Sequence, residues 1–220
     1  MLLRRFLREG GAAMKKFQMM LGALGLIGAL GLGHSLSLAD VTIGQTAPGF
    51  SLPDSKGTNT TLSDYLGKYV VLEWFNYECP FVKKHYGSGN MQKFQKEYTA
   101  KGVIWLSIIS SAPGQQGYCT PNKANEVKQE EDIHSSAVLL DPSGQVGHAY
   151  GAQTTPHMFV INPEGKLIYQ GAIDSIASTN PEDIPKADNY VRLALDQAMA
   201  GQAVATPSTK SYGCSVKYLR

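Results

Sequence analysis

The sequence predicts an α/β fold, and three observations support this prediction. Apolar, β-branched runs alternate with helical patterns along the chain, as expected for strands and helices that pack in layers. One such run, residues 69–75, is followed within five residues by a helix start at Pro80. The 181 residues from Asp40 onward can bury a full hydrophobic core, so we expect a single domain.

The apolar pattern predicts the elements in order. Residues 44–64 are polar and rich in turn residues, so we expect an irregular opening segment. Residues 69–75 are β-branched and aromatic, which is typical of a buried strand. From Pro80 to Gly102 apolar side chains recur at helical spacing, which predicts a helix over that range. The alternation continues with a strand, a helix, a strand, the two strands of a hairpin and a closing helix, over residues 103–109, 121–132, 137–140, 158–161, 167–169 and 187–200.

The first 39 residues have the three-part order of a secretory signal peptide. Lys15 and Lys16 precede an uncharged run over residues 19–32, and small residues stand three and one positions before Asp40. The run is shorter than a membrane span of about 20 residues. We therefore predict a signal peptide over residues 1–39 and an exported, periplasmic or otherwise extracytoplasmic protein. The alternative is an uncleaved segment, which would then be the protein's attachment to a membrane.

The charge of the body argues against a nucleic-acid partner. The chain has 20 Lys and Arg against 18 Asp and Glu, and the first 39 residues hold five of these bases and one acid. The body is therefore slightly acidic and has no clustered basic segment that could neutralise a run of phosphates. Three cysteines are also too few for a disulfide-rich scaffold.

Cys79 is the strongest candidate for a chemically active residue. It falls between a strand and the helix that begins at Pro80, so its thiol would face unpaired N–H groups and the positive end of the helix dipole. Lys83, Lys84 and His85 follow within two turns and would also favour the thiolate. The alternative is an inert buried cysteine.

Two segments in the right order resemble the thioredoxin superfamily. Residues 71–82, Val-Leu-Glu-Trp-Phe-Asn-Tyr-Glu-Cys-Pro-Phe-Val, are similar to its active-site strand and turn, and residues 154–160, Thr-Thr-Pro-His-Met-Phe-Val, to its cis-proline segment. Residues 44–52 are similar to the opening of redoxins, the branch that includes the alkyl hydroperoxide reductase and thiol-specific antioxidant (peroxiredoxin) proteins. The resemblance covers about residues 41–200.

The resemblance implies a thioredoxin fold, in which a central mixed β-sheet is flanked by helices. We expect this domain over residues 40–200 and a C-terminal tail over residues 201–220. Thr155 and Pro156 would be joined by a cis peptide bond placed against Cys79, where the backbone could pair with a bound substrate chain.

The family pattern leaves Cys79 without its usual partner. Thioredoxins carry a second cysteine three positions later, where this chain has Val82. Cys214 is the natural second thiol, because the tail around Gly213 is expected to be flexible and an oxidising compartment favours disulfides. A structural disulfide of the tail and an unrelated free thiol are the alternatives. Cys119, in a glycine-rich loop, ranks third.

The peroxiredoxin pattern is incomplete. Peroxiredoxins carry a proline, a threonine and a later arginine that polarise the peroxide, and the first two positions are Leu72 and Asn76 in this chain. The arginines after position 40 are Arg192 and Arg220, and neither is near Pro156, where the resemblance would place that arginine. A thiolate without these donors loses the positioning that makes attack on a peroxide fast.

Glu73 lies six residues before Cys79, where thioredoxins keep a buried carboxylate that shuttles the proton during disulfide exchange. In an apolar strand its pKa should be raised toward neutrality, which suits that role. A carboxylate exposed at a strand edge is the alternative.

The sequence thus predicts an exported thiol-disulfide oxidoreductase of the redoxin type. The predicted site has Cys79 as nucleophile and Cys214 as resolving thiol, with Glu73, Thr155 and Pro156 beside them. Its partners would be protein thiols or disulfides, or a peroxide, together with an external thiol as electron donor. The alternatives are a thiol peroxidase, a thioredoxin-fold metal or haem-assembly chaperone, and a redox-silent binding module. The histidines show no metal-ligand spacing, so we expect no metal and no cofactor.

Overall fold

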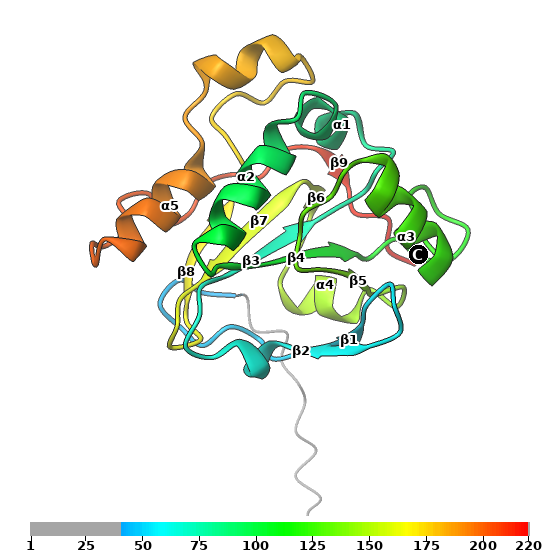
Figure 1. Ribbon diagram of the computed structural model, residues 1–220, viewed down its shortest axis with the longest axis horizontal. Coiled ribbons are helices and arrows are strands. Elements are labelled where there is room, and N and C mark those ends of the chain that lie inside the picture. Colours follow the sequence, from blue (N-terminus) through cyan, green and yellow to red (C-terminus); the bar gives the residue numbers. More distant parts are fainter. Residues whose placement is uncertain (1–40, 220) are drawn as a thin grey trace, which may run out of the picture. The chain divides into compact units, whose positions relative to one another are not determined.

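A computed structural model describes residues 41–219 of the chain (Figure 1). The predicted signal peptide lies outside these described residues. Within residues 41–219, none of the helices is long and apolar enough to cross a membrane.

A five-stranded sheet forms the centre of the described part. β3 (Val70–Trp74) pairs in parallel with β4 (Ile104–Ile109), which pairs in parallel with β5 (Ala137–Leu140). On its other side β3 is antiparallel to β7 (His157–Ile161), which forms a hairpin with β8 (Leu167–Gly171). The order β5-β4-β3-β7-β8 is the mixed sheet that the resemblance implies.

Both faces of this sheet are covered, so every residue of β3 is buried, and all of them except Glu73 are apolar. Val71, Glu73 and Phe75 face a core built with helices, and the residues between them face a second core. The first face is covered by α1 (Pro80–Gly87), α2 (Asn90–Ala100), α3 (Pro121–Glu130) and α5 (Tyr190–Met199) (Figure 1). The second is covered by β1 (Ser51–Pro53), β2 (Asn59–Thr61), the 3₁₀ helix η1 (Leu62–Tyr65) and α4 (Gln145–Ala149).

The single helix predicted from Pro80 to Gly102 is wrong. The structure has two helices there, α1 and α2, separated by Ser88 and Gly89. Gly89 has a φ of 73°, a left-handed conformation that interrupts a right-handed helix and that glycine adopts without steric cost. The short α1 is therefore free to follow its own direction, with Cys79 at its N-terminus. The pattern also missed β1, β2, α4 and a second 3₁₀ helix, η2 (Pro181–Lys186), which are short and lie among turn residues.

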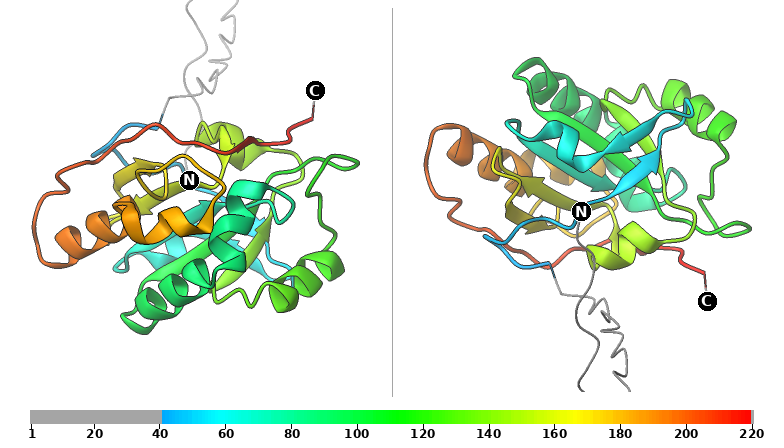
Figure 2. Two further views of the ribbon diagram at one scale, coloured as in Figure 1. Left: turned by 90° about the horizontal axis from the view of Figure 1, so that it is seen from above. Right: turned by 90° about the horizontal axis from the view of Figure 1, so that it is seen from below.

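The C-terminal tail is bound to the domain along its length. Residues 207–218, called the C-terminal strap below, run from the α5 side of the domain past α4 (Figure 2). At one end the Thr209 hydroxyl accepts a hydrogen bond from the backbone N–H of Ala172 at 2.9 Å. Further along, the Tyr212 hydroxyl donates to the Asp174 carboxylate.

The strap is also held beyond Cys214. The Tyr218 hydroxyl donates to the backbone oxygen of Ala152 at 2.7 Å, and its ring stacks on His148 at 4.0 Å. Tyrosine anchors therefore lie on both sides of Cys214, and the prediction of a tail that swings freely is wrong. Two tyrosines flanking a cysteine in an otherwise polar tail are the sequence signal that could have shown this.

Candidate active site

Cys79 is the N-cap residue of α1 and is fully buried. Pro80 takes the first helical position, where an N–H group is not needed. The Cys79 N–H donates to the backbone oxygen of Asn76 at 3.1 Å, and the Cys79 oxygen accepts the first helical hydrogen bond from Lys83 at 2.9 Å. The strand, turn and helix thus place the thiol at the positive end of α1, as predicted.

The cis-proline segment lies against this thiol. The Thr155–Pro156 peptide bond is cis, as the resemblance implies. Thr155 belongs to the short strand β6 (Thr154–Thr155), and its backbone oxygen lies 3.0 Å from the Cys79 sulfur.

The same short strand pairs with the strap. β9 (Cys214–Ser215) is antiparallel to β6, and Cys214 stands opposite Thr155. Because Thr155 lies beside Cys79, this register brings the Cys214 sulfur to 2.8 Å from the Cys79 sulfur, across 135 residues of sequence. Both cysteines are free thiols in this structure, so the site is the reduced form of a pair that a small movement could bond.

Gly213 makes this close approach possible. Its φ is 141°, and a Cβ at this position would lie 2.1 Å from the backbone oxygen of Thr155. The strap backbone therefore rests directly on the cis-proline segment. Gly213, predicted to make the tail flexible, instead permits close contact in the structure.

The two thiols differ in pKa. Burial raises the pKa of Cys79, but hydrogen bonds from Cys214, from the Thr155 side chain and from the Val82 N–H outweigh it and bring this pKa below that of an ordinary cysteine. Burial, together with the hydrogen bond and charge of Cys79, raises the pKa of Cys214 to about 11. Of the two thiols, Cys79 therefore loses its proton more readily, and Cys214 holds its proton more firmly.

The Thr155 hydroxyl is a hydrogen-bond donor that can stabilise a thiolate at Cys79. Thr155 is 3% exposed, and its Oγ1 atom has no hydrogen-bond partner among the described residues. Donation from this hydroxyl to the thiolate is one of the causes that lower the pKa of Cys79. A buried hydroxyl that lacks a partner is thus available to donate to a thiolate at Cys79.

The prediction that the basic residues of α1 favour the thiolate is wrong. Lys84 is buried and forms an ion pair with Asp174 at 3.2 Å. Burial lowers the pKa of His85 to about 4, so this side chain is neutral. Lys83 is exposed to solvent. The low pKa of Cys79 therefore comes from hydrogen bonds rather than from ion pairs.

Glu73 is fully buried, so the alternative of an exposed strand-edge carboxylate is excluded. Burial raises its pKa, and hydrogen bonds from its neighbours lower it by a smaller amount. Its partners are the side chains of Tyr86, Gln95, Trp105 and Ser107, at 2.9 to 3.2 Å. The structure places Glu73 beneath α1, whose Tyr86 it binds, and not in a hydrogen bond with Cys79.

A loop over residues 111–119 holds the turn before Cys79. The Asn76 side chain donates to the backbone oxygen of Gln116 at 3.3 Å, and the N–H of Gly117 donates to the Glu78 carboxylate at 2.7 Å. Cys119 lies in the same loop, and burial raises its pKa to about 11. The structure thus brings Cys79 and Cys214 together and keeps Cys119 as a separate, protonated thiol.

Within residues 41–219, the groups that a peroxiredoxin or a metal chaperone would need do not gather at Cys79. Arg192 on α5 binds Glu97 on α2 through two hydrogen bonds of 2.8 and 2.9 Å. In the part of the chain that the structure describes, no group of three or more His, Cys, Asp and Glu side chains could hold a metal ion.

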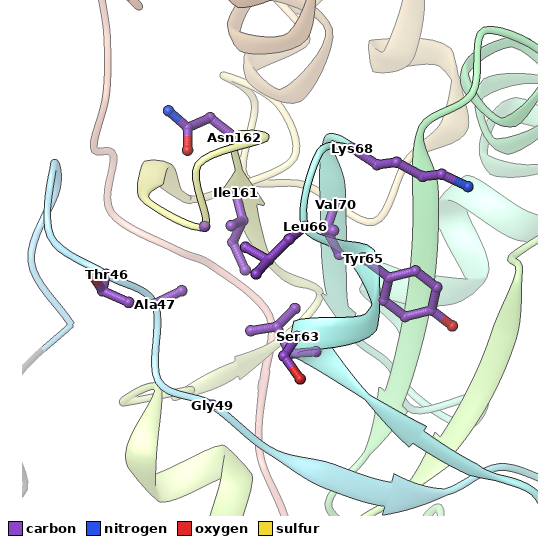
Figure 3. A pocket seen from close by; sticks show the side chains of 12 residues that line it. Thr46, Ala47, Gly49, Ser63, Tyr65, Leu66, Lys68, Val70, Ile161 and Asn162 are labelled. Carbon is purple, nitrogen blue, oxygen red and sulfur yellow. The ribbon is translucent and has the colours of Figure 1, made fainter.

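An apolar cavity of about 230 Å³ lies away from the thiols (Figure 3). Ile161, at the opposite end of β7 from Pro156, and Leu66 line it, whereas the side chains of Tyr65 and Lys68 point away from its centre. Among the described residues, neither a cysteine nor a histidine lines this cavity. The thiol pair is therefore the better candidate for the chemical site.

A mixed sheet flanked by helices, a cysteine at a helix N-terminus and a cis-proline segment beside it together define a redoxin of the thioredoxin superfamily. Comparison with known families agrees. Over residues 43–170 the sequence matches the AhpC/TSA family, and the chain belongs to it.

Relatives within this class are named for thiol chemistry. The thiol-disulfide oxidoreductase ResA of Bacillus subtilis (strain 168) is 30% identical over 128 residues, which are 58% of this chain and 66%, just under two thirds, of ResA. A protein of Mycobacterium tuberculosis (strain H37Rv), whose name assigns it provisionally to the peroxiredoxins, is 25% identical over 141 residues, 58% of this chain and 83% of that protein. The chain is thus related to oxidoreductases that use thiols.

Similarity to a solved structure extends beyond residues 43–170, the segment that matches the family. The crystal structure of a hypothetical protein of Sinorhizobium meliloti 1021 has a TM-score of 0.69 and 26% identity. The match covers 82% of this chain and 96% of that one. The fold is therefore shared across most of both chains.

Proposed function

We propose that this protein is a thiol-disulfide oxidoreductase that cycles between a Cys79–Cys214 dithiol and a Cys79–Cys214 disulfide. One observation carries the proposal: the two sulfur atoms lie 2.8 Å apart and their pKa values are shifted in opposite directions. On oxidation the Cys79 thiolate and the Cys214 thiol form one S–S bond and release one proton and two electrons. A partner disulfide accepts the two electrons and the proton and becomes one thiol and one thiolate, which then takes a proton from water.

Thr155 and Pro156 have a positioning role in this proposal. The Thr155 hydroxyl stabilises the Cys79 thiolate, and the backbone of Thr155 aligns β9 so that Cys214 faces Cys79. The strap thus supplies the second thiol that Val82 cannot, because Val82 occupies the position of the second cysteine of a thioredoxin.

We also propose that Glu73 accepts or returns the proton of the thiol pair through the buried network under α1. Its raised pKa and its hydrogen bond to Tyr86 support this role. Replacing Glu73 by Gln should slow disulfide exchange more at high pH than at low pH, because only the carboxyl group can take up a proton. Equal slowing at every pH would indicate a structural role instead.

Peptide mapping by mass spectrometry without reductant tests the central proposal. After oxidation with glutathione disulfide we expect the Cys79 and Cys214 peptides to be joined, and dithiothreitol should separate them. The variant Cys119→Ser should form the same Cys79–Cys214 disulfide as the wild type, because the Cys119 side chain is separate from the pair. A Cys79–Cys119 bond, or a free Cys214 beside an oxidised Cys79, would contradict the proposal.

A second candidate function is thiol peroxidase activity, favoured by the Thr155 hydroxyl that can donate at the Cys79 sulfur. The thiolate would take one oxygen from a peroxide to form sulfenic acid, and Cys214 would then form the disulfide and release water. Stopped-flow measurement of the reaction with hydrogen peroxide decides this. A rate constant far above that of free cysteine supports a peroxidase, and a rate constant equal to it excludes one.

Export is likewise part of the proposal, and it rests on the signal-peptide pattern of residues 1–39. Fractionation of a host cell followed by mass measurement tests it. The protein should appear outside the cytoplasm with a mass that corresponds to a chain beginning at Asp40. A full-length protein in the cytoplasmic fraction would contradict export.

A further inference from the structure

We infer that an external thiol exchanges with this protein at Cys214 and not at Cys79. The inference rests on the proposed function, because it concerns which sulfur of the Cys79–Cys214 disulfide meets the partner. In a thioredoxin-type pair the cysteine at the helix N-terminus would be the natural point of contact. The strap of this chain reverses the arrangement.

Access favours Cys214. Cys79 has no exposed surface, whereas Cys214 is partly exposed and its neighbour Ser215 is exposed. The backbone at Gly213 lies against the backbone of Thr155, so the edge of β6 is already occupied by the chain's own strand. A partner that attacked Cys79 would first have to remove β9.

The strap is held too well for removal to be a routine step. Its backbone is tied on the far side of Cys214, where Val216 donates to Gln153 at 3.0 Å and Lys217 accepts from Ala112 at 2.8 Å. The tyrosine anchors described above add hydrogen bonds at both ends. Attack on Cys214 breaks none of these contacts.

The leaving group also favours Cys214 as the sulfur attacked. A partner thiolate that bonds to the Cys214 sulfur breaks the S–S bond and expels Cys79, which leaves as a thiolate stabilised by the Thr155 hydroxyl and the Val82 N–H. Attack on Cys79 would instead expel Cys214, the thiol of higher pKa and poorer leaving ability. A second partner thiol then attacks the partner's own sulfur and releases Cys214, so the partner dithiol is oxidised and the protein is reduced.

The charge beside Cys214 suits an incoming thiolate. The Lys217 ammonium group donates to the Ser215 hydroxyl at 3.2 Å, and its charge lowers the pKa of Cys214 against the effect of burial. A positive charge at the point of contact raises the local concentration of anionic thiols. The expected partner is therefore an anionic thiol, or a protein dithiol with acidic groups near it.

Rapid-quench mapping tests the inference directly. The disulfide form of the wild-type protein is mixed with glutathione, quenched in acid after a fraction of one turnover, and alkylated. We expect glutathione on Cys214 and the alkyl group on Cys79. Glutathione on Cys79 would overturn this inference and leave the proposed function intact, whereas failure to form the starting disulfide would overturn both.

Two single-thiol variants, each made together with Cys119→Ser, give a second, independent measurement. Cys214→Ser keeps a hydroxyl that can donate to Cys79, so the strap and the thiolate should both remain. Despite its lower pKa, Cys79 in this variant should react with dithiobis(nitrobenzoate) at least about tenfold more slowly than Cys214 in the variant Cys79→Ser, because buried thiols are shielded from attack. Circular dichroism checks that both variants are folded. Faster reaction at Cys79 would overturn the inference.

The variant Lys217→Gln separates charge from access. Reduction of the disulfide by glutathione, an anionic thiol, should slow by about threefold, as expected for the loss of one nearby solvent-exposed charge. Reduction by mercaptoethanol, which is neutral as a thiol and smaller, should slow by less, and added salt should remove the difference. Equal rates for the variant and the wild type with glutathione would show that the thiol does not approach Cys214.

Discussion

Replacing Gly213 by Ala is expected to weaken the Cys79–Cys214 disulfide. The new Cβ would stand 2.1 Å from the Thr155 oxygen, whereas carbon–oxygen contacts begin at about 3.3 Å, so the strap must move by about 1 Å. A side chain at this backbone conformation costs a further roughly 1–3 kcal/mol. The reduced strap can move away and relieve both effects, but the disulfide holds it in place.

This strain should appear in the redox equilibrium. We expect the equilibrium constant for disulfide formation against glutathione to fall by roughly 5- to 150-fold, the factor that corresponds to about 1–3 kcal/mol. The assay is quantification of the disulfide in a series of glutathione buffers. The matched control is Gly201→Ala, whose φ of 72° gives a similar backbone cost but whose Cβ meets no atom within 4 Å. Equal constants for Gly213→Ala and the wild type would refute the claim that the strap rests on the cis-proline segment.

Three further substitutions test other parts of the structure. Thr155→Val should raise the pKa of Cys79 by about 1–2 units, because a hydrogen bond to a charged group is lost; the ultraviolet absorbance of the thiolate measures this pKa. The control is Thr154→Val, which should leave this pKa unchanged because the Thr154 hydroxyl donates to the backbone oxygen of Pro156. Equal pKa shifts in the two variants would contradict the reasoning. Asp174→Asn should lower the free energy of unfolding in urea by about 3–5 kcal/mol, because the buried charge of Lys84 loses its ion pair. A loss below about 1 kcal/mol would disprove this. Burial lowers the pKa of His157 to about 4, so the wild type should lose up to about 3 kcal/mol of stability as the pH falls from about 6.5 through 4. The variant His157→Phe should not show this loss. If the free energies of unfolding in urea differ between the two proteins by the same amount at pH 7 and pH 4.5, the reasoning is contradicted.

Local sequence patterns predicted the parts of the fold that depend on neighbouring residues. The run around β3 is mostly apolar because both faces of that strand are buried. Pro80 could be recognised as a helix start because a proline before a helical pattern commonly occupies the first helical position. Cys79 and the Thr155–Pro156 segment could be singled out for the same reason, since each is recognisable within a few residues. Gly89, by contrast, was absorbed into a helical pattern that its φ interrupts.

The parts that the sequence could not predict depend on contacts between distant segments. From the sequence alone, Lys84 is predicted to be an exposed charge on a helix. In the fold it is buried against Asp174, which lies ninety residues later in the chain. Gly213 has the same identity whether it loosens a tail or permits close packing, and only the register of β9 on β6 decides between the two. The position of Cys214 opposite Thr155 is set by that register and has no local signal.

The separation of the two cysteines along the chain also affects how the protein is made. Cys214 follows Cys79 by 135 residues, so a ribosome working at about 5–20 residues per second needs roughly 7–27 seconds to add it. During that interval the segment around Cys79 has neither its cover nor its partner thiol. A nascent chain is therefore open to wrong disulfides at Cys79 until β9 arrives, and a newly made chain needs a reducing environment, or a chaperone at that segment, for as long as synthesis lasts.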